Sequence, residues 1–201
     1  MDAYEAIFRS FNYTMQRLGY PEQDERTIRR AVGWGDSNLL KPFVKPKDLT
    51  SALAIYRRHH ATSLRKATRL FPGVKGLLAA LKKNGFRLAV ASNRPTRFSL
   101  IALSALGIRG SFDMVLCGDK VKRGKPHPDI LKKIMARFRA GPKETVYAGD
   151  MAIDVRAANR AGVWPVAVTT GSSTLFELKN ERPFAVIRRI RDLPKVLRRL
   201  K

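Results

Sequence analysis

The sequence TVYAGDMAID, residues 145–154, decides the expected fold because it runs a short apolar segment directly into two carboxylates. The residues before Gly149 favour a strand, Gly149 allows a sharp turn, and the small residues up to Gly162 are typical of a helix that packs on a sheet. Ligands of open α/β sheets bind at the carboxyl ends of the strands. We therefore expect Asp150 and Asp154 to lie in a metal site at that edge.

From about residue 71 onward, helical and extended patterns alternate along the chain. Apolar runs bounded by turn residues predict strands at 86–91, 114–117, 145–149, 165–168 and 184–187. Helical spacing of apolar residues predicts helices at 74–83, 96–106, 128–138, 150–162 and 193–200. Strands that alternate with helices in this way predict a mainly parallel, Rossmann-like sheet with right-handed crossovers.

The first 70 residues are expected to be entirely helical. Apolar residues at helical spacing predict helices at 4–18, 24–32 and 48–67, with a proline-punctuated loop at 42–46. Asp2 stands where its side chain could accept a hydrogen bond from a first-turn amide. The change of character near residues 70–74 predicts two domains, a helical one at 1–70 and an α/β core at 71–201.

The charge is unusual, because 40 Lys and Arg residues against 16 Asp and Glu residues give a net charge of +24. Such a surface attracts phosphorylated substrates, nucleic acid or anionic membranes. The basic residues are dispersed over segments that otherwise have the pattern of amphipathic helices. We therefore favour a solvated basic surface over dedicated nucleic-acid binding.

Several classes of protein are not favoured by the sequence. No stretch approaches the roughly 18 consecutive apolar residues of a membrane span, and no secretion signal is recognisable at the N-terminus. The single cysteine, Cys117, lies in an apolar run and is interpreted as a buried hydrophobic residue. We expect a cytoplasmic protein.

Three strand ends carry residues suited to phosphate chemistry. Ser92 and Asn93 follow one predicted strand, Lys125 lies in the loop after another, and two aspartates follow a third. The carboxyl ends of parallel strands share one edge, so these residues are expected to meet. A hydroxyl, amide groups and a lysine can hold phosphoryl oxygens, and carboxylates bind Mg²⁺.

With these residues in place, the sequence resembles the haloacid-dehalogenase-like hydrolase superfamily, in its phosphoglycolate-phosphatase-like branch. The segments LAVASN (88–93), GKPHP (124–128) and GDMAID (149–154) resemble its second, third and fourth motifs, and FPGV (71–74) resembles the exit from its helical cap. The resemblance implies that Ser92 and Asn93 bind phosphate, that Lys125 stabilises it, and that Asp150 and Asp154 bind Mg²⁺. Ser92 and Lys125 would be the catalytic residues present.

The resemblance also implies that residues 1–70 form the cap and that Gly33, Trp34 and Gly35 form a loop facing the substrate. On the residues alone, two glycines around an indole could hold a ring over a ligand or simply make a turn. The resemblance favours the first of these interpretations.

One expected motif is missing from these 201 residues. The superfamily's first motif, a strand followed by Asp-x-Asp-Gly-Thr, supplies the nucleophile and a Mg²⁺ ligand, and no segment here matches it. In this fold the corresponding strand is central, between the strands ending at Ser92 and Gly149. We expect that the genuine chain begins upstream of Met1.

These observations predict a Mg²⁺-dependent phosphatase of small phosphomonoesters, for example 2-phosphoglycolate, that works through an aspartyl-phosphate intermediate. The alternative is a catalytically inactive relative that binds a phosphorylated ligand or a protein partner. The expected state is a monomer or a homodimer.

Overall fold

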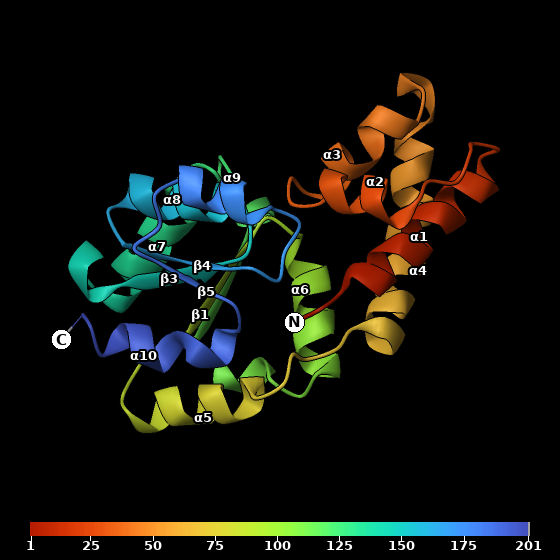
Figure 1. Ribbon diagram of the computed structural model, residues 1–201. Helices are drawn as coiled ribbons and strands as arrows, with labels where there is room; N and C mark the ends of the chain where they lie inside the picture. Colours follow the sequence, from red (N-terminus) through yellow and green to blue (C-terminus); the bar gives the residue numbers. More distant parts are fainter. Residues whose placement is uncertain (201) are drawn as a thin grey trace.

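A computed structural model describes residues 1–200 of the chain and shows a group of helices beside an α/β layered core (Figure 1). The helical group, called the cap below, consists of α1 (Tyr4–Arg17), α2 (Glu25–Ala31), α3 (Asp36–Leu40) and α4 (Leu49–Ala67). Its apolar core joins the buried faces of these helices and includes Phe11, Met15, Ile28, Leu40 and Tyr56.

Helices α1 and α4 are the framework of the cap and run antiparallel. Asp2 and Arg69, just outside the two helices, form an antiparallel bridge with backbone hydrogen bonds of 2.8 Å in both directions. The Asp2 carboxylate accepts a hydrogen bond from the Tyr4 amide at 3.0 Å. This is the first-turn contact that the sequence predicted.

Within residues 71–200, the core contains five short strands and six α-helices. The strands are β1 (Ala89–Ser92), β2 (Met114–Cys117), β3 (Val146–Gly149), β4 (Trp164–Val168) and β5 (Ala185–Ile187). The helices are α5 (Val74–Lys83), α6 (Thr96–Ala105), α7 (Asp129–Phe138), α8 (Ala152–Ala161), α9 (Leu175–Asn180) and α10 (Leu193–Leu197). All strand pairs are parallel, which confirms the predicted α/β class with a parallel sheet.

The sheet is divided into two parts. β1 pairs with β2, and β3, β4 and β5 pair in that order, but β1 and β3 are not hydrogen-bonded as neighbours. Within the described residues, one edge of β1 and one edge of β3 therefore have no strand partner. The division lies between the strands that end at Ser92 and Gly149, where the family resemblance implies a further central strand.

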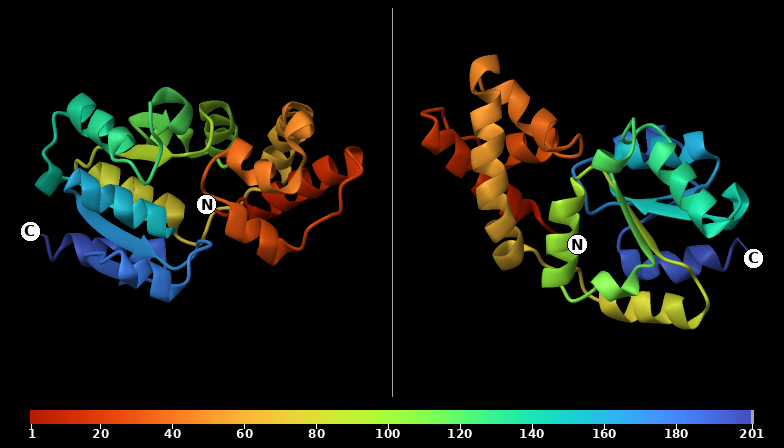
Figure 2. Two further views of the ribbon diagram at one scale, coloured as in Figure 1. Left: turned by 90° about the horizontal axis from the view of Figure 1, so that it is seen from above. Right: turned by 180° about the vertical axis from the view of Figure 1, so that it is seen from behind.

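Helices cover both faces of the divided sheet (Figure 2). One face packs against α7, α8 and α9, and the other against α5, α6 and α10. The apolar clusters include residues from both parts of the sheet, because Ala91 of β1 and Tyr147 of β3 pack on the same helices. The helical layers therefore hold the two parts together.

The cap contacts the core at several places. Helix α4 packs on α6 through small and apolar side chains, including Leu64, Phe98 and Ala102. From α2, Arg29 donates hydrogen bonds to the carbonyls of Thr170 and Gly171 at 3.2 and 3.1 Å. The assignment of 1–70 and 71–201 as separate domains stays a prediction.

Most predicted elements are present, with differences at their ends. The strand predicted from residue 86 begins only at Ala89, because the Leu88 amide donates to the Asp113 carboxylate at 2.7 Å instead of joining a strand ladder. The short helices α3 and α9 were not predicted, and α10 ends at Leu197, before the predicted end at residue 200. Two 3₁₀ turns, Lys41–Phe43 and Pro46–Asp48, occupy the predicted loop. Each helix within residues 1–200 is too short or too polar to span a lipid bilayer.

Candidate active site

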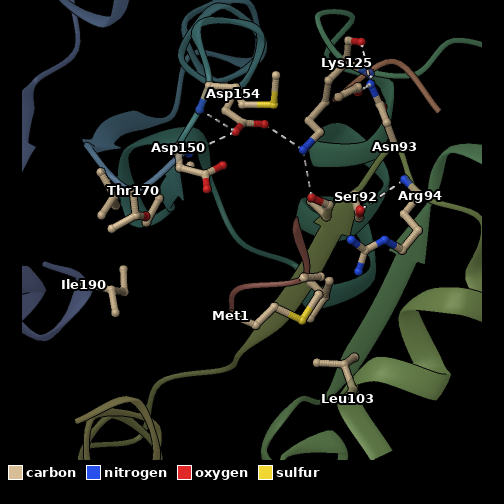
Figure 3. Close-up of a pocket in the computed structure, with 18 of the residues that line it drawn as sticks. Met1, Ser92, Asn93, Arg94, Leu103, Lys125, Asp150, Asp154, Thr170 and Ile190 are labelled. Carbon is tan, nitrogen blue, oxygen red and sulfur yellow. Dashed lines mark hydrogen bonds and ion pairs between the residues drawn. The ribbon is translucent and has the colours of Figure 1, made fainter. Parts of the chain in front are cut away.

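A cavity of about 550 Å³ lies between the two parts of the sheet and beneath the cap (Figure 3). Its core wall is formed by residues at the carboxyl ends of β1 and β3, including Ser92, Asn93, Asp150 and Asp154. Lys125 reaches the same cavity from the loop after β2. The structure therefore brings together the candidate residues from all three strand ends.

Lys125 is the buried centre of this group. Its ammonium donates to Asp154 Oδ1 at 2.6 Å, to the Tyr147 hydroxyl at 2.7 Å and to the Ala91 carbonyl at 3.1 Å. Burial alone would lower the pKa of Lys125, but the charge of Asp154 and the contacts with Tyr147 outweigh it and raise that pKa above its ordinary value. Lys125 is therefore a fixed cation at neutral pH.

The carboxylate of Asp154 is almost fully used in hydrogen bonds. Its Oδ1 accepts from Lys125, and its Oδ2 accepts from the amides of Asp150 and Met151 at 3.0 and 3.1 Å. A Cβ atom at Gly149 would collide with the Asp154 side chain, so this turn requires glycine. Asp154 thus fixes the turn that follows β3 as well as the position of Lys125.

Asp150 differs from Asp154 in having no side-chain partner. None of its side-chain atoms takes part in a hydrogen bond or an ion pair within residues 1–200. It faces the cavity next to Asp154 (Figure 3). Burial, and then the negative charge of Asp154, raise the pKa of Asp150 above its ordinary value. A positively charged ligand would relieve both effects.

Ser92 and Asn93 have different surroundings. The Ser92 hydroxyl accepts a hydrogen bond from the Arg94 amide at 3.1 Å and lines the cavity. The Asn93 side chain donates to the carbonyls of Gly33 and Lys125, both at 2.9 Å, and accepts from the Lys125 amide at 2.8 Å. The Asn93 side chain therefore positions the loop that carries Lys125 and the cap loop at Gly33. Because the side chain is engaged in these contacts, we propose a phosphate contact only through the Asn93 backbone.

The predicted cap loop is brought to the cavity only in part. Gly33 and Gly35 line the cavity and have φ angles of 117° and 90°, in the region that favours glycine. Any Cβ at Gly33 would also collide with Met151 of the core. Trp34, by contrast, is 47% exposed and does not line the cavity.

Sequence reasoning missed two polar residues of the site. Tyr147 was interpreted only as a strand former, yet its hydroxyl lies 3.0 Å from the Ala91 carbonyl and 3.2 Å from Asp154 Oδ1. Arg94 sends its guanidinium into the cavity from the loop after β1 (Figure 3). A hydroxyl inside an otherwise apolar strand, and a basic residue between Asn93 and Pro95, were the available signals.

The donor set fits a hard divalent cation only in part. Carboxylate oxygens are suitable ligands for Mg²⁺, and the half-buried Asp150 side chain has no hydrogen-bond or ion-pair partner among the described residues. Residues 1–200 nevertheless contain no group of three or more His, Cys, Asp or Glu side chains placed to hold a metal ion. A complete site would need further oxygen ligands from substrate, water or another segment.

Comparison with known proteins now identifies the family. The profile of the haloacid dehalogenase-like hydrolase family matches residues 1–168. The chain belongs to this family. It is 30% identical over 191 residues to a phosphoglycolate phosphatase from Nitrosococcus oceani, an alignment that covers 91% of this chain and 85% of that protein.

Further relatives agree with this assignment. A phosphoglycolate phosphatase from Aquifex aeolicus is 27% identical over 98% of this chain and 91% of its own length. The crystal structure of a protein from Haemophilus somnus, described as a predicted phosphoglycolate phosphatase, superposes with a TM-score of 0.91 at 25% identity, covering 97% of this chain and 92% of that one. These findings confirm the predicted family branch, fold class and type of enzyme, a hydrolase of phosphoric monoesters.

Proposed function

We propose that this site belongs to a Mg²⁺-dependent phosphatase of small phosphomonoesters. The observation that carries the proposal is the convergence of Ser92, Lys125 and Asp150 on one cavity at the carboxyl ends of three strands. These groups supply a hydroxyl, a fixed cation and an unpartnered carboxylate, which suit a phosphate group and a divalent cation.

Each residue has a distinct proposed role. The Ser92 hydroxyl and the Asn93 backbone bind phosphoryl oxygens, and Lys125 stabilises their negative charge. Lys125 can do so while keeping its contact with Asp154 by releasing the Ala91 carbonyl, which at 3.1 Å is its longest hydrogen bond. Gly33 and Gly35 close the cavity on the cap side without placing a side chain in it.

Mg²⁺ would bind at Asp150, with Asp154 beside it. When bound, it would neutralise charge on the phosphoryl group and hold that group in place. Both oxygens of Asp154 already accept protein hydrogen bonds, so its main proposed role is to fix the Asp150 turn and Lys125. Asp150 is the residue free to contact the cation directly.

The nucleophile would come from a strand that fills the gap between β1 and β3. The facing edges of these strands have no strand partner among the described residues, and the cavity between them is lined by apolar side chains such as Val90, Val146 and Ala148. Met1 lies in the same cavity, so a segment joined to it could enter the gap directly. We propose that such a segment brings an aspartate that forms the aspartyl-phosphate intermediate.

The gene itself provides the test. The codons in frame before Met1 are read, and the extended protein is assayed for Mg²⁺-dependent hydrolysis of an aryl phosphate, with Asp150→Asn as the inactive control. We expect a preceding strand that ends in a pair of aspartates and activity that the control lacks. An early in-frame stop codon would contradict the proposed source of the nucleophile, and no turnover by an intact extended protein would contradict the proposed activity.

The alternative is an inactive relative that binds a phosphorylated ligand or a protein partner. It is favoured by the absence of a nucleophilic aspartate motif in the sequence beside retained phosphate-binding residues. Stabilisation of the protein by a phosphorylated ligand without any turnover would support this alternative. The names of the relatives make 2-phosphoglycolate the first substrate to try. Cytoplasmic location, a monomeric or homodimeric state and lack of dedicated nucleic-acid binding stay predictions.

A further inference from the structure

Arg94 is a half-buried cation, and one of its guanidinium nitrogens is fully buried without a partner. Its Nη1 atom is buried and has no hydrogen-bond partner among residues 1–200, where the only other such side-chain atom is Thr68 Oγ1. None of the seven ion pairs between described residues includes Arg94. Burial lowers the pKa of Arg94, but a guanidinium stays protonated in proteins.

The guanidinium faces the cavity that holds the proposed phosphate site, near Tyr56 and His60 of the cap. Arg94 follows Ser92 by two residues, and in Figure 3 its side chain points into the cavity on the side opposite Asp150 and Asp154. Tyr56 and His60 of α4 line the cavity on the cap side. Burial, and then the charge of Arg94, lower the pKa of His60 to about 3, so His60 is neutral and does not compete for an anion.

A guanidinium nitrogen that is buried without a partner is unfavourable, and a planar oxyanion that pairs with it removes that penalty. The fork of N–H groups matches a carboxylate with two parallel hydrogen bonds. The phosphate is already assigned to Ser92 and Lys125, so Arg94 is available for a second anionic group of the same molecule. We propose that Arg94 binds the carboxylate of a substrate that carries both a carboxylate and a phosphate; this inference rests on the phosphate site of the proposed function.

Binding of two small probes tests this assignment on the purified full chain with Mg²⁺ present. The probes are 2-phosphoglycolate and ethyl phosphate, which differ mainly in the carboxylate. We expect the wild-type protein to bind 2-phosphoglycolate about 10- to 100-fold more tightly, as charge-assisted hydrogen bonds predict. Arg94→Met should bind the two probes within about 3-fold of each other, and Arg94→Lys should keep part of the difference.

Arg97→Met is the matched control, because Arg97 is exposed and lies three residues further along the chain. It should keep the wild-type preference. A wild-type protein that binds both probes equally or neither of them, or an Arg94→Met protein that keeps the preference, overturns the assignment. Tighter binding of a bisphosphate than of 2-phosphoglycolate also overturns it, because Arg94 would then serve a second phosphate.

Two further measurements distinguish this proposal from its alternatives. The midpoint of unfolding of ligand-free Arg94→Met should not fall, since the variant removes a charge whose buried Nη1 has no partner, whereas a structural role for Arg94 would lower it. Hydrolysis of an aryl phosphate by the wild-type extended protein reports on the proposed function separately. A preference for the carboxylate-bearing probe without hydrolysis would support the Arg94 assignment and contradict the phosphatase proposal. Hydrolysis without this preference would support the phosphatase proposal and contradict the Arg94 assignment.

Discussion

The Lys125–Asp154 pair and Arg94 line the same cavity, and their charges are satisfied to very different extents. Lys125 is bonded to a carboxylate, a hydroxyl and a carbonyl, and it joins the loop after β2 to the turn after β3. Arg94 has a buried Nη1 without a partner among the described residues. The Lys125–Asp154 charges therefore link the two parts of the sheet, whereas the charge of Arg94 stays available to a ligand.

The largest effect is expected for Lys125→Met, which breaks the buried Lys125–Asp154 pair. The variant leaves the Asp154 carboxylate buried without its cation, and removing one partner of a buried ion pair costs about 3–5 kcal/mol of unfolding free energy. Denaturant unfolding measures this loss. The double variant Lys125→Met/Asp154→Asn should recover part of it, because it leaves no uncompensated charge.

Lys82→Met is the matched control for this prediction. Lys82 also lies 2.6 Å from a carboxylate, that of Asp113, but the two side chains are 39% and 34% exposed. Such an exposed pair contributes about 0–1 kcal/mol. Equal losses from the two lysine variants would show that burial does not distinguish the pairs.

A smaller effect is expected for Tyr147→Phe. The hydroxyl accepts from Lys125 at 2.7 Å and lies 3.0 Å from the Ala91 carbonyl, so its loss removes polar contacts that bridge the gap between β1 and β3. The expected loss is about 1–2 kcal/mol in denaturant unfolding. Tyr13→Phe removes a hydroxyl from a ring that is 39% exposed and should change little. A Tyr147→Phe protein as stable as wild type would contradict the bridging role.

Much of this fold could be predicted because its signals are local. Gly149 between an apolar run and two aspartates marks a strand end followed by a helix, and β3 and α8 lie where that pattern placed them. The same holds for the core helices that end at asparagine or glycine. Short helices such as α3 were missed because five residues carry too little periodicity to be recognised.

The site was harder to predict than the fold, because its contacts join distant residues. The sequence identified Ser92, Lys125 and Asp150 from their places after strands. It gave no indication that the Asn93 side chain would be engaged by Gly33 and the lysine loop, contacts that span 60 and 32 residues. Which charges are paired depends on tertiary packing, so Arg94 could be recognised as unpaired only in the structure.

Substitution of Asp150, on the acidic side of the cavity, is expected to change stability in the opposite direction. Asp150 has a raised pKa, so the folded state binds protons more strongly than the unfolded state, and the charged group destabilises the fold above that raised pKa. Asp150→Asn should therefore increase stability by about 1 kcal/mol at neutral pH without metal. The gain should shrink as the pH falls through the raised pKa toward the ordinary aspartate value of about 3.9.

Unfolding curves at several pH values, with and without Mg²⁺, check this prediction. Mg²⁺ should stabilise the wild-type protein and not Asp150→Asn, and its effect should weaken on acidification from a higher pH than an unperturbed aspartate would give. Asp36→Asn is a control, because Asp36 also lines the cavity but is paired with Arg57 at 2.7 Å. A variant at position 150 that is less stable than wild type at neutral pH would contradict the unpartnered state of Asp150.

The smallest effect is expected for Arg30→Ala, which removes an exposed pair between the cap and the core. Arg30 lies 2.6 Å from Glu177, and the two side chains are 54% and 34% exposed, so solvent screens their attraction. The variant should lose less than about 1 kcal/mol of unfolding free energy, as measured with denaturant. This small loss is expected even though Arg30 and Glu177, like Lys125 and Asp154, are far apart in the chain. A loss as large as that of Lys125→Met would mean that long-range linkage, and not burial, decides the contribution of a charge pair in this protein.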